Sequence, residues 1–285
     1  MTASQSWPAP AKLNLFLHIT GQRDDGYHLL QTVFQFLDLA DQLYFDINNN
    51  GEISRRSELP GVSPEQDLVV RAARLLQQET GCPQGVSISM EKHLPMGAGL
   101  GGGSSDAATT LLALNALWDC GLKRARLCEL GLQLGADVPV FIGGHAAWAE
   151  GVGEHLQPVD VAECWYVVLT PEVTVSTAEI FADPQLTRNS PAITIRDFRA
   201  GRVRNDIEPV VRVLYKQVDD ALRWLSDFGE ARMTGTGACV FLPCEDRAQA
   251  ESVLQQGPPA AGFIARGLNR HPIEDILEGF EAARK

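Results

Sequence analysis

The sequence lacks the patterns by which metal-binding and disulfide-bonded domains are usually recognised. Its six cysteines include no C-x-x-C pair and no cysteine and histidine set with zinc spacing, and no H-E-x-x-H box occurs. We therefore expect the cysteines to be reduced and mostly structural. No stretch approaches the roughly 20 apolar residues of a membrane-spanning helix, and the opening MTASQSWPAPAK has neither region of a signal peptide. The default expectation is a cytoplasmic protein with no membrane association.

Basic residues are scarce relative to acidic ones. The 285-residue chain has 24 Lys and Arg against 36 Asp and Glu, a formal net charge of −12. Such a surface repels the phosphates of nucleic acids and anionic lipids, so we expect neither as a partner. An anionic substrate would need a local positive site. The length allows one large core or two modest ones, and it leaves a monomer and a homodimer both open.

Hydrophobic periodicity predicts strands and helices arranged in two lobes. Alternation predicts strands at 12–20 and 85–92, and helical spacing with terminal glycines predicts helices at 67–80 and 124–134. A capping box at 176–179 predicts the start of a short helix. A long amphipathic helix is expected to carry five apolar residues on one side: Val211, Leu214, Val218, Leu222 and Leu225. We expect a lobe boundary near 156–163, giving an N-terminal ATP-binding domain at 1–160 and a C-terminal domain at 161–285.

The most distinctive stretch is PMGAGLGGGSSDAA, at 95–108. It lies between a strand ending at Lys92 and a helix starting near Ser105, whereas glycine linkers normally join lobes. The Walker A pattern is excluded because no lysine occurs between Lys92 and Lys123, and the match to G-x-G-x-x-G at 97–102 lacks an acid at a following strand end. Glycines let the backbone approach a ligand and expose consecutive N–H groups, which form an anion site with the positive end of the helix.

We predict that the residues of this stretch bind the phosphates of ATP. They are Pro95, Met96, Gly97, Ala98, Gly99, Leu100, Gly101, Gly102, Gly103, Ser104 and Ser105. Asp106 is either a partner of the helix dipole or a catalytic group, and the sequence leaves both open. The second glycine-bearing turn, at 234–237, is either another backbone loop against the ligand or a structural entry into a strand.

Four segments, in order along the chain, resemble the GHMP kinase superfamily, named for its galactokinase, homoserine, mevalonate and phosphomevalonate members. They are PAKLNLFLHITGQRDDGYHLLQTVFQ, LPMGAGLGGGSSDAA, LGADVPVFIGGHAAWAEGVGE and MTGTGACVF. The resemblance extends from Pro10 to about Phe241. It implies a two-lobe α+β fold, with a ribosomal-protein-like N-terminal sandwich and a ferredoxin-like C-terminal lobe. ATP would lie against the glycine stretch, and the active site would fall in the cleft between the lobes.

Within the superfamily, the chain is most similar to the kinase of a cytidine diphosphate-linked sugar alcohol in the non-mevalonate isoprenoid pathway. This similarity implies transfer of the ATP γ-phosphoryl group to the 2-hydroxyl of that small molecule, with Mg²⁺ as the metal and no ligands assigned. By similarity, Asp137 takes the hydroxyl proton and Lys12 stabilises charge nearby. Six further residues match positions that hold the cytidine-bearing substrate: Asn14, Tyr27, His28, Phe34, Thr177 and Phe181.

Taken without the resemblance, these residues also have simpler interpretations. Lys12 would suit a solvated strand face, Asp137 an ordinary turn after a helix, and the aromatic residues a core. Two rival functions remain: another small-molecule kinase of the superfamily, of the homoserine or mevalonate type, and a non-catalytic nucleotide-binding protein. The aromatic set favours a substrate with a nucleobase. The presence of both Lys12 and Asp137 argues against an inactive relative.

Overall fold

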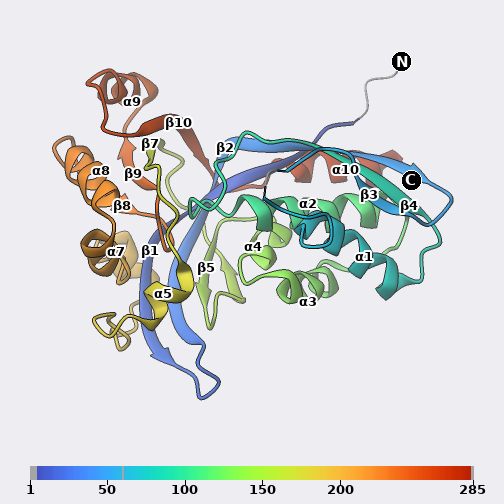
Figure 1. Ribbon diagram of the computed structural model, residues 1–285, viewed down its shortest axis with the longest axis horizontal. Coiled ribbons are helices and arrows are strands. Elements are labelled where there is room, and N and C mark those ends of the chain that lie inside the picture. The colour runs from blue at the N-terminus through green and yellow to red at the C-terminus, as the bar shows by residue number, and fades with distance from the viewer. Residues whose placement is uncertain (1–4, 60, 284–285) are drawn as a thin grey trace.

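Two lobes lie side by side, joined by long strands that run through both (Figure 1). The computed structural model describes residues 5–59 and 61–283. The predicted mixture of helices and strands is confirmed. Within the described residues, no helix is both long and apolar enough to cross a membrane.

An antiparallel ribbon forms the spine of the molecule. Strands β1 (Trp7–Gln22) and β2 (His28–Asn48) pair along most of their length, with three register shifts. Bulges of this kind bend a strand and increase its twist. Different parts of β2 also pair with β4 (Gly85–Glu91), β5 (Ala147–Glu150) and β10 (Ala261–Leu268), so this strand belongs to the sheets of both lobes.

The first lobe adds four strands to the ribbon and packs four helices beside it (Figure 1). Its elements are β3 (Ile53–Arg55), α1 (Leu68–Thr80), β4 (Gly85–Glu91), α2 (Gly102–Leu117), α3 (Arg124–Leu134), α4 (Val138–Gly143), β5 (Ala147–Glu150) and β6 (His155–Pro158). Every residue of α2 from Ser105 to Leu114 is buried. Because α2 is buried on all sides along this length, it occupies the centre of the lobe, and its ends are the parts that can meet a ligand.

The second lobe is a four-stranded antiparallel sheet with helices packed against it. Its elements are β7 (Trp165–Thr170), α5 (Thr177–Ala182), α6 (Ile195–Arg199), α7 (Glu208–Leu214), α8 (Lys216–Ser226), β8 (Arg232–Met233), β9 (Val240–Cys244), α9 (Arg247–Leu254) and β10 (Ala261–Leu268). The strand order is β10-β7-β9-β8. Two β-α-β units with this order give a ferredoxin-like lobe, as expected.

The hydrophobic core is divided in the same way as the fold. One cluster of buried residues fills the first lobe around α2, a second fills the helical side of the second lobe, and a third lies where the lobes meet. The last helix, α10 (Ile273–Ala283), returns to the first lobe, where Ile273 and Phe280 pack on its cluster. The predicted domain ranges 1–160 and 161–285 remain a prediction, and the chain re-enters the first lobe after β10.

Two local predictions need correction. Helix α2 begins at Gly102, three residues before the expected start near Ser105, because glycine at position 101 ends the turn with a φ of 74° and the helical bonds begin at once. The single long helix expected around Val211 to Leu225 is two helices, because the backbone is extended at Tyr215. The break turns Leu214 outward, where 52% of its surface is exposed.

Candidate active site

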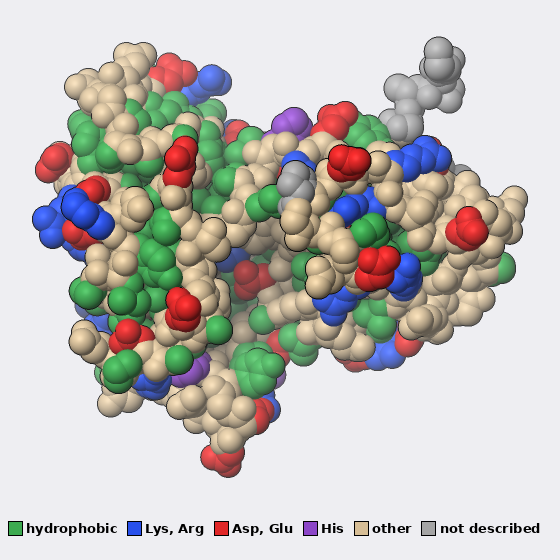
Figure 2. Space-filling model, viewed as in Figure 1, with side chains coloured by type: hydrophobic (Ala, Val, Ile, Leu, Met, Phe, Trp, Pro, Cys, Tyr) green, Lys and Arg blue, Asp and Glu red, His purple; other side chains and the backbone are tan. Residues whose placement is uncertain are grey.

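A cavity of about 1060 Å³ lies between the two lobes. Figure 2 shows the surface hollowed at this position, with basic and acidic side chains visible at its floor. The lining comes from the turn and the middle of the β1–β2 ribbon, from the glycine stretch, from the turn before α4 and from the second lobe. Segments far apart in the sequence therefore meet here. The volume of the cavity is enough for one large ligand or two small ones.

The glycine stretch forms one wall of this cavity. Its residues from Pro95 to Ser104 all line the cavity, and they lead directly into the N-terminus of α2. The first N–H groups of a helix have no partner within it, and the aligned peptide dipoles add positive potential there. The start of α2 therefore has the backbone geometry expected of an anion site, and phosphate binding there remains a prediction. Ser105 was predicted to bind phosphate with the other residues of the stretch, but it is not among the residues that line the cavity, and its side chain is fully buried.

The second glycine-bearing turn packs directly on the first. A Cβ atom on Gly99 would lie 2.8 Å from the carbonyl oxygen of Gly237 and 2.9 Å from that of Thr234. The amide of Cys239 also donates to the carbonyl of Ala98, at 3.2 Å. This turn brings its residues 235–237 into the lining. It therefore shapes the cavity as well as entering a strand.

Lys12 lies at the centre of the site and is not a surface lysine. Only 3% of its side chain is exposed, and its Nζ atom is 3.3 Å from Oδ2 of Asp137. The same Nζ donates to Oδ1 of Asn14, and it lies 5.4 Å from the centre of the Phe34 ring. A buried ammonium is costly unless it is paired, and these three neighbours compensate it. Phe34 lines the cavity but is only 2% exposed, because its ring lies beneath the Nζ atom of Lys12.

Asn14 is held so that its oxygen faces the lysine. Its amide nitrogen donates to Oγ1 of Thr32 at 3.0 Å, and its backbone N–H donates to Oγ1 of Thr234 at 2.8 Å. The side-chain oxygen is left for the ammonium of Lys12. In this structure Asn14 orients the lysine, and its contact with substrate remains a prediction. The Thr234 contact also ties the second lobe to β1.

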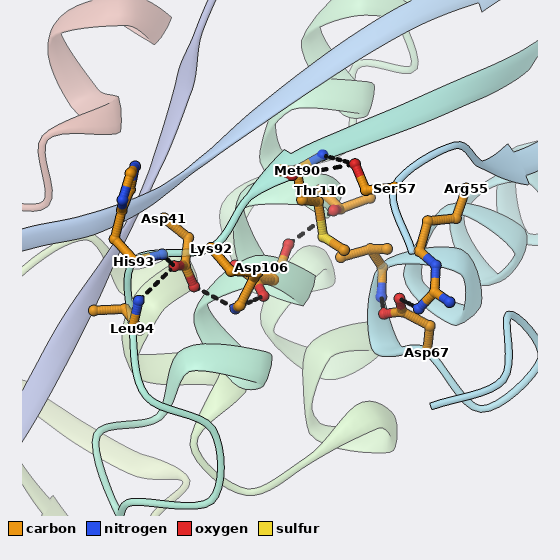
Figure 3. A network of polar contacts seen from close by, with 11 residues as sticks. Asp41, Arg55, Ser57, Asp67, Met90, Lys92, His93, Leu94, Asp106 and Thr110 are labelled. Carbon is orange, nitrogen blue, oxygen red and sulfur yellow. Dashed lines mark hydrogen bonds and ion pairs between the residues drawn. The ribbon is translucent and has the colours of Figure 1, made fainter. Parts of the chain in front are cut away.

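Both ends of the glycine stretch are held by one ionic network. Figure 3 shows Lys92 between the carboxylates of Asp41 and Asp106, with two backbone N–H groups pointing at Asp41. Those N–H groups belong to His93 and Leu94, at 2.6 Å and 2.8 Å. Asp41, from β2, therefore fixes the entry to the glycine stretch, and Asp106, in α2, fixes its exit. Asp106 joins this network and also lines the cavity.

The charge state of Asp106 depends on this network. Burial raises the pKa of its carboxyl to about 7, with Lys92 opposing the rise and Asp41 adding to it. Burial would lower the pKa of Lys92, but the two carboxylates outweigh it and raise that pKa. Within the described residues, Oδ1 of Asp106 has no hydrogen-bond partner. One cation thus compensates two buried carboxyls only in part.

Four of the six predicted substrate residues gather at the end of the cavity away from the glycine stretch. Tyr27, 65% exposed, and His28 come from the β1–β2 turn, and Phe181 and Thr177 come from α5. The rings of His28 and Phe181 are stacked, with centroids 4.8 Å apart and planes at 30°. Oγ1 of Thr177 lies 3.1 Å from Oγ1 of Thr236 in the second glycine turn. An aromatic and hydrogen-bonding end is therefore present where the sequence predicted it.

The sequence did not reveal the apolar end of the cavity beyond the glycine stretch. Leu59, Val62 and Leu68 line it, together with Gln66. The loop that carries them is anchored by the buried ion pair of Arg55 with Asp67, which Figure 3 also shows. Asp67 also caps α1 by accepting the N–H of Val69 at 3.0 Å. The aspartate before an apolar helical stripe was the available signal, but it pointed only to a helix start.

Comparisons with known proteins agree with this geometry. The model of the GHMP kinases N terminal domain matches residues 67–145, and that of the GHMP kinases C terminal matches 192–261. A 4-diphosphocytidyl-2-C-methyl-D-erythritol kinase from Thiobacillus denitrificans is 59% identical, over 96% of this chain and 99% of its own length. One of the same name from Nitrosococcus oceani is 58% identical, over 95% and 98%.

The chain belongs to the GHMP kinase family. A crystal structure of a 4-(cytidine 5'-diphospho)-2C-methyl-D-erythritol kinase superposes with a TM-score of 0.79 at 31% identity, covering 92% of this chain and 99% of that one. The mevalonate kinase of Methanococcus jannaschii superposes at 0.68 with 16% identity, covering 94% and 99%, and shows the shared fold. The two-lobe GHMP kinase fold and an ATP-dependent small-molecule kinase are thereby confirmed.

Kinases of this family imply Mg²⁺, and the residues present fit a metal that arrives with the nucleotide. Among residues 5–59 and 61–283, no three acidic, histidine or cysteine side chains are grouped as a metal cage. Mg²⁺ does not require one, because it is commonly held by few protein groups together with phosphate oxygens. Ser104 lies on the cavity wall at the start of α2.

Substituting Gly101 tests how the glycine stretch positions Lys12. A Cβ atom there would lie 3.1 Å from Cε and Cγ of Lys12 and 3.0 Å from Cζ of Phe141, at a φ of +74°. We expect Gly101→Ala to weaken ATP binding about ten-fold, because small misplacements at such sites are costly. Gly121→Ala is the matched control, since its φ is +68° with open space around the Cβ. Calorimetry with ATP checks this, and equal affinity in both variants would contradict it.

Removing Lys92 tests the network in Figure 3. Lys92→Met leaves two buried carboxyls without a cation, so we expect it to lower the free energy of unfolding by about 3–5 kcal/mol at pH 8. The pKa of Asp106 is 3.8 in the unfolded chain and about 7 in the folded protein. Protonation of Asp106 therefore stabilises the folded state fully below pH 3.8, and this stabilisation is lost as pH rises from 3.8 through 7. The loss should therefore shrink at pH 6.

Urea unfolding at the two pH values measures both effects. Adding Asp106→Asn to Lys92→Met should recover part of the stability at pH 8 and reduce the pH dependence. Lys216→Met, at a side chain 81% exposed in an i,i+4 pair, controls for the loss of a lysine. A loss at Lys92 that is equal at pH 6 and pH 8 would show that charge is not its cause.

Proposed function

We propose that this kinase phosphorylates the 2-hydroxyl of 4-diphosphocytidyl-2-C-methyl-D-erythritol, using ATP and releasing ADP. The product would be the 2-phosphate, within the non-mevalonate route to isoprenoid precursors. Relatives at 56–59% identity over nearly the whole chain carry the name of this kinase. The carrying observation in the structure is the buried ammonium of Lys12 beside the carboxylate of Asp137, between a phosphate-binding wall and an aromatic pocket.

The nucleotide would lie along the wall formed by the glycine stretch. The free amides at the start of α2 can hold the phosphates without arginine side chains, which suits an otherwise acidic chain. The apolar end at Leu59, Val62 and Leu68 suits the flat face of a purine. This assignment places the γ-phosphate end of the nucleotide toward Lys12.

The acceptor would occupy the other half of the cavity. Tyr27 and Phe181 offer aromatic faces for a cytosine ring, and His28 offers hydrogen bonds at its edge. The hydroxyl of Thr177 and the turn at 235–237 lie between this end and Lys12. A cytidine held in this way would direct its sugar alcohol toward Asp137.

Phosphoryl transfer requires positioned groups more than covalent chemistry from the protein. Asp137 would accept the proton of the attacking hydroxyl as the new bond to phosphorus forms. Lys12 would hold that carboxylate in place and stabilise negative charge on the transferring group. The amides of α2 would bind phosphate oxygens throughout. Mg²⁺, when bound with the nucleotide, supplies neutralising charge on the β- and γ-phosphates.

The cellular setting is part of the same proposal. All six cysteines are unpaired, as is usual in a reducing compartment. We therefore place the reaction in the cytoplasm.

A panel of alcohols tests the substrate. Purified enzyme with ATP and Mg²⁺ should release ADP with 4-diphosphocytidyl-2-C-methyl-D-erythritol and not with mevalonate, homoserine or galactose. Turnover of only one of the last three would contradict the proposed substrate, although the enzyme would remain a kinase. The absence of ADP release with all four would favour a binding protein.

A substitution at Asp137 tests the proposed base. Asp137→Asn keeps the side-chain volume but cannot take the proton, so we expect turnover to fall by at least about two orders of magnitude, with ATP affinity kept. Steady-state kinetics and ATP calorimetry measure the two quantities. Asp160→Asn, at a side chain 84% exposed, is the matched control. Near-normal turnover of the Asp137 variant would remove this residue from the proton transfer.

A further inference from the structure

Arg188 contacts both aromatic partners at the acceptor end of the cavity, although it lies outside every motif of the sequence. Its Nη2 atom donates to the carbonyl oxygens of Phe181 and Asp183, both at 2.8 Å, and its Nη1 donates to that of Leu186 at 3.1 Å. These three bonds are local to α5 and the chain segment that follows it. They fix the guanidinium independently of the first lobe.

The remaining contact of Arg188 reaches the β1–β2 turn. Its Nε donates to Nε2 of His28 at 3.2 Å. A guanidinium cannot act as an acceptor and does not lose its proton in proteins, so Nε2 of the imidazole must be unprotonated. The ring proton of neutral His28 is then on Nδ1. Arg188 thereby determines which of the two ring nitrogens is a donor.

The charges around His28 favour this neutral form. Burial lowers the pKa of His28, and the positive charge of Arg188 lowers it further. The nearby carboxylate of Asp25 is engaged by Arg23 and by the backbone N–H of Tyr27. The stack on Phe181, whose own carbonyl is bound to the same guanidinium, fixes the plane of the ring.

We propose that Arg188 is a positioning residue that holds His28 as the Nδ1–H tautomer, stacked on Phe181, and so sets the base specificity of the acceptor site. The inference rests on the proposed function, because it concerns the nucleobase of that substrate. Cytosine presents an acceptor at N3, which an Nδ1–H donor can bind, whereas O2 is an acceptor in cytosine and uracil alike. Uracil presents an N3–H donor at the same edge, and two facing donors leave a buried group unpaired.

The tautomer can be measured without any substrate. In a long-range ¹H–¹⁵N spectrum of the full-length enzyme with ¹⁵N-labelled histidine, the signals absent from His28→Gln identify this ring. We expect the wild type to show the proton on Nδ1. A proton on Nε2 in the wild type would overturn the proposal, and this result requires no Arg188 variant.

Calorimetry with CDP and UDP tests the specificity. The wild type should bind CDP at least about ten-fold more tightly than UDP, the worth of about one hydrogen bond. In Arg188→Gln this preference should fall to about three-fold or less, mainly through weaker CDP binding, with ATP affinity unchanged. Arg188→Lys should be intermediate, because an ammonium keeps the charge but cannot serve the three carbonyls and the imidazole together.

Arg223→Gln controls for the loss of an arginine, since its side chain is 71% exposed on α8 and pairs with Asp219. It should keep the wild-type preference. An unchanged CDP to UDP ratio in a folded Arg188→Gln would overturn the role of Arg188 while leaving the proposed function intact. If the wild type binds neither nucleotide, the proposed substrate fails together with the base specificity, and the tautomer alone then decides what Arg188 does.

Discussion

The buried ammonium of Lys12 is the constraint on which the rest of the site depends. An ion at this depth is stable only if opposite charge and hydrogen-bond acceptors surround it. Asp137 and Asn14 provide them, and Gly101 allows the glycine stretch to pass within contact of its side chain. Each of these groups comes from a different element. The requirement to compensate one charge therefore brings together the strand, the phosphate wall and the carboxylate that the chemistry needs.

The acidic composition of the chain makes this arrangement informative. With a net charge of −12, general attraction cannot recruit a nucleotide, and the site must be positive by local design. Backbone amides at the start of α2 provide part of that potential, and the lysines provide the rest. Yet Lys92 is shared by two carboxyls, and Lys12 by one. Because both Lys12 and Lys92 are already paired with carboxylates, we expect the backbone amides at the start of α2 to be the main groups that bind an anion.

Local features were predictable from the sequence, whereas cross-lobe contacts were not. The glycine stretch between a strand and a helix identified one wall of the cavity, and alternation placed Lys12 on a strand, because both patterns are encoded by neighbouring residues. Burial could not be read in this way: Phe34 lines the cavity as an aromatic substrate contact would, but the sequence does not show that it is 2% exposed beneath Lys12. Arg188 carries no local signal at all, since its partner His28 is 160 residues away.

Strand β2 explains how two distant ends of the cavity keep their separation. It carries His28 at the acceptor end, Phe34 under Lys12 and Asp41 at the glycine stretch. At about 3.3 Å per residue, these thirteen steps span at most roughly 43 Å. Strand β2 does not position Asp137, which lies at the start of α4. Its position depends on the close packing of α3 on α4, where Gly131 has no room for a Cβ because Ile142 Cδ1 would be 2.6 Å away. Strand β2 and the packed helices α3 and α4 therefore meet at Lys12. The alignment of the proposed general base, Asp137, with the phosphate depends on both supports.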